Sequence, residues 1–431
     1  MISKTQLITL FLFVILFVSK SNAQITATTD CLKTQSIHIE DLVMSSDSFI
    51  QTNLPTINAP ERKVKKILLE NYNFLKNSFS NKDIIKNNVV EQELNAIVDN
   101  IIEANPKLKD KKFNMLYATE YVANASSLGN NIFYIYPGLF EILDNDQQLT
   151  FILCHEIAHQ VLKHFQYSIE ESIRLEKTDL TNESSLNLFR NKRELEINAD
   201  AFGFELYSNL NYQEAEAIKA LEHLKDSDSI LYSKNIDIKE QFNFKDYPFK
   251  RFWINKKEQL LKIKKYKSNY RNLDSLRTHP NVDTRISAIK KINIPPLQQI
   301  NTKVSKQHLT KIKEWQDANY LCILKDSNRY DLHLFFALEK HYLNPKNIFA
   351  SEVIASTLFN IYKAKKEKQF SKFIPPPNAF ASNTSFLELK LFLKNTEARE
   401  IRKIGLWFCN SIEEKSNTLI KIQEKFKRLD K

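Results

Sequence analysis

The run His155-Glu156-Ile157-Ala158-His159 constrains this chain more than any other stretch. It lies in the mostly apolar segment 149–162, whose pattern is typical of a buried helix. At 3.6 residues per turn, His155 and His159 lie about 40° apart on one helical face. Two imidazoles one turn apart can hold one Zn²⁺ ion. Glu156 points to one side of this pair, where its carboxylate can act as a general base without binding the metal.

A third ligand is required, because a catalytic zinc site has three protein ligands and one open position. The best candidate is Glu196, in a second helix expected from Glu194 to Leu206. Asp200 lies one turn later on the same face, where it can orient a ligand imidazole. Ala199 is small and would let this helix approach the helix of segment 149–162, which we call the metal helix. The sequence therefore predicts a site with two histidines and one glutamate.

Two other histidines need separate interpretations. His164 follows His155 by nine residues, so in one continuous helix it would face away from the metal and have a structural role. His279, followed by Pro280, has two alternatives. It could donate a hydrogen bond to the oxyanion, or occupy the open zinc position and hold the enzyme inactive. We expect the first, because Arg285, which we also assign with Asp200 to the shell that supports the metal ligands, indicates a formed substrate-side surface. His279→Ala should then lower turnover, whereas loss of a blocking ligand should raise it.

Three motifs in order carry a resemblance: His155 to His159, Glu196 to Asp200, and His279-Pro280 with Arg285. Together they resemble the HtpX/BepA-like family of zinc peptidases, relatives of the CAAX prenyl proteases. The resemblance covers about residues 60–293. It implies a mainly helical gluzincin fold, one zinc ion held by His155, His159 and Glu196, and an active-site edge strand at Asn124-Ala125. The chain looks more like the soluble, exported members than the membrane-embedded ones.

The expected fold class is mainly α with a small β-sheet. Only 4 glycines argue for helices. Segments 113–122 and 132–136 are rich in aromatic and β-branched residues and predict a β-hairpin around the turn-rich connection 124–131. A strand just before the metal helix could bind an extended substrate by strand addition. Residues 165–193 predict a helical extension and a mobile loop, and residues 397–426 a single helix.

Four segments are expected along the chain. Residues 1–23 are typical of a signal peptide, with Lys4, an apolar core and small residues before Gln24, although an uncleaved anchor is the alternative. Residues 24–59 have little periodicity and predict a linker. The peptidase domain would span 60–293. Residues 294–431 predict a helical C-terminal domain, either irregular, which we favour, or built from tetratricopeptide-like repeats.

Charge and cysteines limit the partners and the compartment. The net charge of +11 would become +9 after loss of Lys4 and Lys20. No nucleic-acid recognition motif accompanies it, so we expect a solvated basic face that meets an anionic envelope surface rather than nucleic acid. Cys154 is expected in the core. Cys322 and Cys409 could pair in an oxidising compartment.

These features predict an exported zinc metalloendopeptidase, periplasmic or secreted, that is soluble after signal removal and acts on polypeptides of the envelope. One alternative is a chaperone or assembly factor with a largely structural or autoinhibited zinc site. Another is a zinc hydrolase with a non-peptide substrate. The general base at Glu156 favours the peptidase, because a structural site needs no base. The sequence does not predict the oligomeric state.

Overall fold

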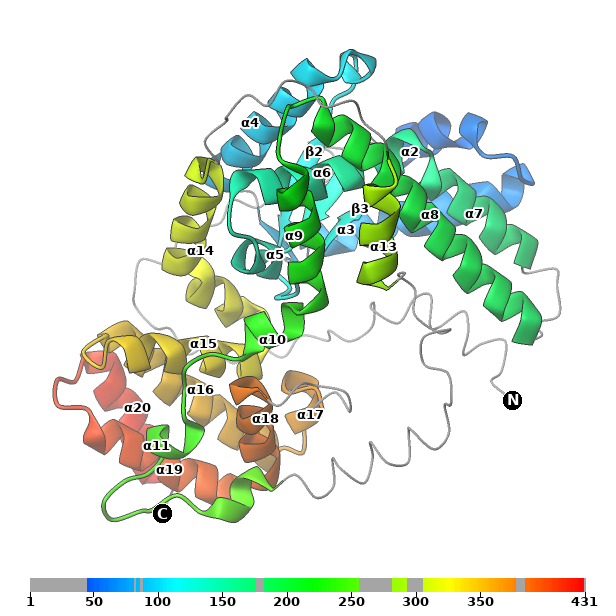
Figure 1. The fold of residues 1–431 in the computed structure, drawn as a ribbon. Helices are drawn as coiled ribbons and strands as arrows, with labels where there is room; N and C mark the ends of the chain where they lie inside the picture. Colours follow the sequence, from blue (N-terminus) through cyan, green and yellow to red (C-terminus); the bar gives the residue numbers. More distant parts are fainter. Residues whose placement is uncertain are drawn as a thin grey trace. The chain divides into compact units, whose positions relative to one another are not determined.

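The structure, a computed structural model, describes residues 45–80, 83–85, 88–175, 182–255, 281–292, 305–376 and 384–429. The predicted signal peptide and His279 lie outside these ranges. The described residues form two compact units (Figure 1). The first comprises 45–231, 281–292 and 305–320, and the second 232–255 and 321–429. The boundaries of the predicted peptidase domain, 60–293, and of the predicted C-terminal domain, 294–431, remain predictions.

The first unit contains a four-stranded sheet in the order β1-β2-β4-β3. Its strands are β1 (Ile84–Ile85), β2 (Asn114–Ala118), β3 (Ala125–Ser127) and β4 (Ile132–Ile135). The predicted hairpin is wrong, because β2 and β4 lie side by side but run parallel. The connection between them contributes β3, which pairs antiparallel with the other side of β4. Ala-Ser-Ser lacks the β-branched pattern of a strand, so the residue pattern did not indicate β3, and only the family resemblance predicted an edge strand at Asn124-Ala125.

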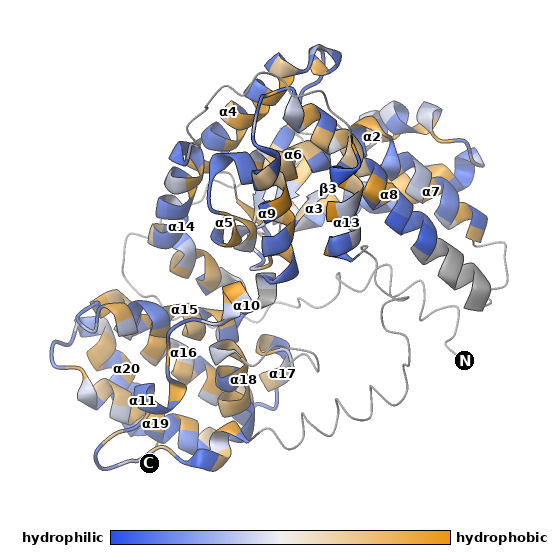
Figure 2. Cartoon of the chain, viewed as in Figure 1, coloured by the Kyte–Doolittle hydropathy of each residue, from blue (hydrophilic) through white to orange (hydrophobic). Residues whose placement is uncertain are grey.

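Helices α2 (Ser46–Asn53), α3 (Glu61–Ser80), α4 (Asn88–Ala104) and α7 (His164–Leu175) pack in the same unit. The linker prediction is therefore wrong for residues 46–56, which form α2 and the 3₁₀ turn η2 (Leu54–Thr56). Ser45 caps α2, and the buried Phe49 packs against Tyr72 of α3, with ring centroids 6.0 Å apart. In Figure 2, these helices carry both polar and apolar colours, as expected for helices that bury one face.

The metal helix, α6 (Asp146–Val161), is buried along most of its length. The side chain of Asn145 caps it by accepting a hydrogen bond from Gln148 N at 3.1 Å. Asp146 accepts backbone hydrogen bonds from His308 and Leu309 at the start of α14 (Gln307–Asp326). Helices α8 (Asn182–Ser208) and α9 (Glu214–Lys225) pack against α6, and α13 (Val282–Lys290) packs against both of them. Helix α6 is thus fixed by hydrogen bonds at its first turn and by helix packing along its length.

The described residues of the second unit form helices joined by loops, with one isolated β-bridge between Phe244 and Tyr247. Its main helices are α15 (Tyr330–Leu343), α16 (Ile348–Lys366), α18 (Ser385–Asn395), α19 (Ala398–Ser411) and α20 (Asn417–Arg428). The single helix predicted over 397–426 is therefore wrong. The chain leaves α19 after Ser411, and the Ser416 hydroxyl caps α20 by accepting from Leu419 N. Gly405 allows the two helices to meet, because a Cβ there would lie 2.3 Å from the Phe426 ring.

The states of the cysteines and the character of the helices bear on the predicted disulfide bond and compartment. Cys409 is a buried free thiol, so the proposed Cys322–Cys409 pair is wrong; Cys322 takes part in a disulfide bond. Cys154 is also free and buried in α6, as the sequence predicts. Among the helices in the described ranges, none combines the length and apolar character needed to cross a membrane.

Candidate metal centre

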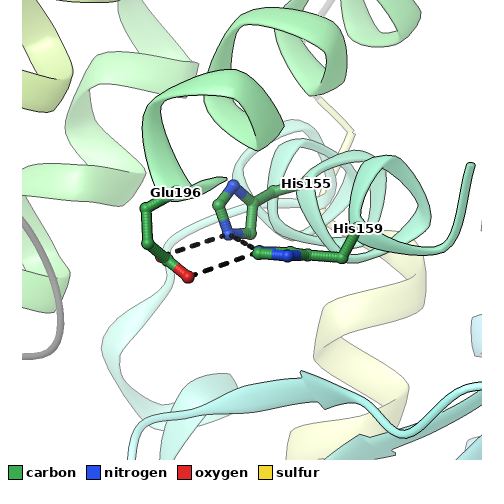
Figure 3. A group of neighbouring side chains, drawn as sticks. All are labelled: His155, His159 and Glu196. Carbon is green, nitrogen blue, oxygen red and sulfur yellow. Dashed lines mark hydrogen bonds and ion pairs between the residues drawn. The ribbon is translucent and has the colours of Figure 1, made fainter. Parts of the chain in front are cut away.

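Within the described residues, one group of side chains has the geometry to hold a metal ion: His155, His159 and Glu196. Their ligand atoms all lie within 4.8 Å of one another. The two Nε2 atoms are 3.1 Å apart, and Glu196 carboxylate oxygens lie 3.7 Å from His155 Nε2 and 3.5 Å from His159 Nε2 (Figure 3). Helix α6 supplies both imidazoles and α8 the carboxylate. The structure thus brings together the three residues that the sequence singled out as ligands.

A buried ion pair between Asp200 and Arg285 supports His155 on the side of its ring that faces away from the cluster. The Nδ1 atom of His155 lies 2.9 Å from Asp200 Oδ1. Arg285 of α13 donates two hydrogen bonds to the same carboxylate, at 2.6 and 2.7 Å. Burial alone would raise the pKa of Asp200, but hydrogen bonds from Arg285 and His155 outweigh it and lower that pKa. Since Asp200 accepts a hydrogen bond from Nδ1–H of His155, the Nε2 lone pair of His155 is free to face the ligand cluster.

Arg285 lies in the shell of residues around the metal ligands, to which the sequence assigned it together with Asp200. Its side chain is 8 % exposed and lies against Asp200, with Nη2 also 3.4 Å from His155 Nδ1. These contacts place the guanidinium inside the protein, where it supports His155 through Asp200. The side chain does not form the substrate-side surface that was also expected. The sequence linked Arg285 to the neighbouring His279 because the two are close along the chain.

Glu156 is buried next to the cluster but is not one of its three members. Burial raises the pKa of its carboxyl to about 7, although the neighbouring His155 and a hydrogen bond from the backbone of Ser127 oppose this rise. Ser127 belongs to β3, so the sheet edge contacts the carboxylate directly. A carboxyl group with a pKa near neutrality can both take and return a proton under ordinary conditions.

The sequence predicted that His164 faces away from the site, but the structure shows it facing the site. Helix α6 ends at Val161, and Lys163 adopts a left-handed conformation with φ 59° before α7 begins at His164. The reversed chain brings His164 Nδ1 to 2.8 Å from His159 Nδ1. Burial lowers the pKa of His159 to about 3 and that of His164 to about 4, so both rings are neutral near pH 7. The sequence has no glycine at this turn to indicate the reversal.

Gly203 is a second contributor that the sequence reasoning missed. A Cβ at this position of α8 would lie 2.9 Å from both Cα and N of His155. Real Cβ atoms do not approach backbone so closely, so only glycine lets α8 sit this near α6. Ala199, the residue expected to allow the approach, is fully buried in the same helix. A glycine seven residues after the candidate ligand Glu196 could have signalled this close contact.

The edge strand is the last predicted part of the site. Asn124 is exposed just before β3, and Ala125 is its first residue. Backbone hydrogen bonds join Asn124 O to Tyr136 N and Leu128 N to Ile132 O. Because antiparallel pairs alternate, the backbone groups of Ala125 and Ser127 point to the opposite side of β3. No strand of the described residues pairs with that side, which we call the open side of β3. The Ser127 hydrogen bond to Glu156 fits this direction.

A mainly helical unit with a small mixed sheet and a His-His-Glu cluster has the donor set of a zinc-dependent metallopeptidase. Two overlapping segments, 88–182 and 174–293, match the profile of peptidase family M48. This match supports an M48 metallopeptidase domain in this part of the chain. No curated protein matches the chain.

Proposed function

We propose that the protein is a zinc metalloendopeptidase that hydrolyses peptide bonds, with Glu156 as general base and His155, His159 and Glu196 as metal ligands. The observation that carries the proposal is the placement of the Glu156 carboxyl, buried beside the three-residue cluster and outside it. A purely structural metal site would gain nothing from an additional buried carboxyl group, because burying an ionisable group costs free energy.

The residues present fit zinc. Two imidazole nitrogens and one carboxylate are a donor set of catalytic zinc sites, which leave a fourth position open. The hydrogen bond between His155 and Asp200 also supplies the support that zinc-binding histidines usually have. When bound, Zn²⁺ lowers the pKa of a coordinated water molecule to about 7 and polarises the scissile carbonyl.

The protein's own groups would then move one proton. Glu156 takes it from the attacking water and returns it to the amine that leaves when the peptide bond breaks. His279 stays a proposed oxyanion donor or gate, since it lies outside the described residues.

An extended polypeptide is the proposed substrate. The open side of β3 offers the backbone N–H and C=O of Ala125, and strand addition there would run the substrate past Glu156. Asn124 would contribute through its exposed side chain, because its carbonyl already bonds Tyr136. A peptide bound this way is selected mainly by its backbone, which suits unfolded proteins better than folded ones.

Export completes the proposal. The N-terminal pattern before Gln24 supports a cleaved signal, and turnover of envelope proteins in the periplasm or outside the cell would follow. The basic composition supports peripheral contact with an anionic envelope surface. Sequencing the N-terminus of the protein recovered outside the cytoplasm tests this part, and a retained Met1 would contradict it.

The activity is tested by incubating the purified protein with a reduced, unfolded protein, with and without a zinc chelator, and identifying the fragments by mass spectrometry. We expect internal cleavages that chelation abolishes and added zinc restores. A protein that binds unfolded chains and zinc but yields no fragments would instead support the chaperone alternative.

A further inference from the structure

In each ligand imidazole, the Nδ1 atom, which points away from the cluster, has a partner, but the two partners differ in chemistry. For His155 it is the carboxylate of Asp200, 2.9 Å from Nδ1. For His159 it is the imidazole of His164, whose Nδ1 lies 2.8 Å from His159 Nδ1. Carboxylates, backbone carbonyls and waters are the usual partners of zinc-binding histidines. A neutral imidazole in this position therefore needs its own explanation.

The direction of this hydrogen bond follows from the position of His159 Nε2. That atom faces the cluster, 3.1 Å from His155 Nε2 and 3.5 Å from Glu196 Oε1. A metal-binding Nε2 must offer a lone pair, so the ring proton of His159 lies on Nδ1 and is donated. His164 Nδ1 is then the acceptor, and His164 carries its own proton on Nε2.

The surroundings allow this arrangement. Two rings that both carried a proton on Nδ1 could not approach to 2.8 Å. His164 is also one of the residues that line a groove of about 600 Å³, together with Leu162, Tyr167, Leu195, Asn198 and Phe202. Water in this groove can accept the Nε2 proton of His164, so the acceptor tautomer loses no hydrogen bond.

We propose that His164 is a positioning residue for the metal centre: by accepting the Nδ1 proton of His159, it fixes the tautomer and the ring orientation that aim Nε2 at the metal. This inference rests on the proposed zinc function and assigns to α7 a part in it. Without an acceptor, the buried Nδ1–H of His159 loses its partner, and the tautomer with the proton on Nε2, which cannot bind metal, gains population.

Three variants separate positioning from packing. His164→Asn keeps an acceptor, since Oδ1 of asparagine can take the place of Nδ1. His164→Leu fills a similar volume without an acceptor. Ser168→Ala is the matched control on α7, because the Ser168 hydroxyl donates to the backbone carbonyl of His164 and not to its ring.

The measurements are the zinc dissociation constant from competition with a chromophoric chelator, the visible spectrum of the Co²⁺-substituted protein, and the melting temperature of the metal-free protein. We expect His164→Leu to bind zinc about 10–100-fold more weakly, with an altered Co²⁺ spectrum. His164→Asn and Ser168→Ala should stay close to the wild type. Unchanged affinity in His164→Leu, or equal losses in His164→Leu and His164→Asn, would overturn the proposal. A wild-type protein without zinc affinity would instead refute the proposed function itself.

Discussion

Asp200 lies behind His155, with its Oδ1 atom 2.9 Å from the Nδ1 atom of the imidazole, and its carboxylate is completely buried. The same carboxylate accepts both hydrogen bonds from Arg285. One carboxylate thus orients a candidate metal ligand and neutralises a buried guanidinium, so the metal centre and the fold depend on each other at this point.

We predict that Asp200→Asn weakens zinc binding and destabilises the protein together. Loss of the carboxylate should lower zinc affinity about 10–100-fold and, by leaving Arg285 unpaired, cost about 3–5 kcal/mol of folding stability. Chelator competition and urea denaturation of the metal-free protein measure the two effects. Wild-type stability in the metal-free variant would contradict the ion-pair part of this account.

Gly203→Ala should disturb the same centre through the backbone. The new Cβ would need space that Cα and N of His155 occupy, so α8 must move away from α6 and carry Glu196 with it. We expect a stability loss of about 1–3 kcal/mol and weaker zinc binding. Asn198→Ala, at an exposed position of the same helix, is the control and should change neither quantity.

The residues of the centre were largely predictable from the sequence, but their surroundings were not. Helical periodicity alone placed His155 beside His159 and Asp200 one turn from Glu196. His164 was misplaced because nothing in Leu162-Lys163 marks the end of α6. Strand β3 was predicted only through the family resemblance, because its three small residues carry no periodic signal. Strands β2 and β4 were paired in the wrong direction because pairing depends on tertiary contacts.

The strand edge gives a prediction about substrate binding. Ala125→Pro removes an N–H that points to the open side of β3, and an edge strand tolerates proline there. Peptide hydrolysis should fall at least tenfold while zinc affinity stays unchanged. Ser126→Pro is the counterpart, because the backbone N–H of Ser126 faces β4. Losing that N–H should destabilise the sheet. Equal kinetics for Ala125→Pro and the wild type would exclude substrate pairing at this edge.

Glu156 should make the metal-free protein less stable as the pH rises. Its pKa is about 7 in the folded protein against an ordinary value of 4.5, so the stability that its neutral form provides at low pH is lost as the pH rises through 7. Glu156→Gln cannot ionise. Between pH 5 and pH 8 its stability relative to the wild type should therefore increase by about 2 kcal/mol. Urea denaturation with chelator at both pH values tests this, and a constant difference would show that the carboxyl titrates normally.

The central claim is that Glu156 acts on the reaction while Glu196 holds the metal. The most direct test compares zinc content and cleavage of an unfolded protein for the wild type, Glu156→Gln and Glu196→Ala. We predict that Glu156→Gln retains its zinc and loses at least 100-fold in cleavage rate, whereas Glu196→Ala loses zinc and activity together. Cleavage by Glu156→Gln at the wild-type rate, or loss of zinc from it as complete as from Glu196→Ala, would contradict the account.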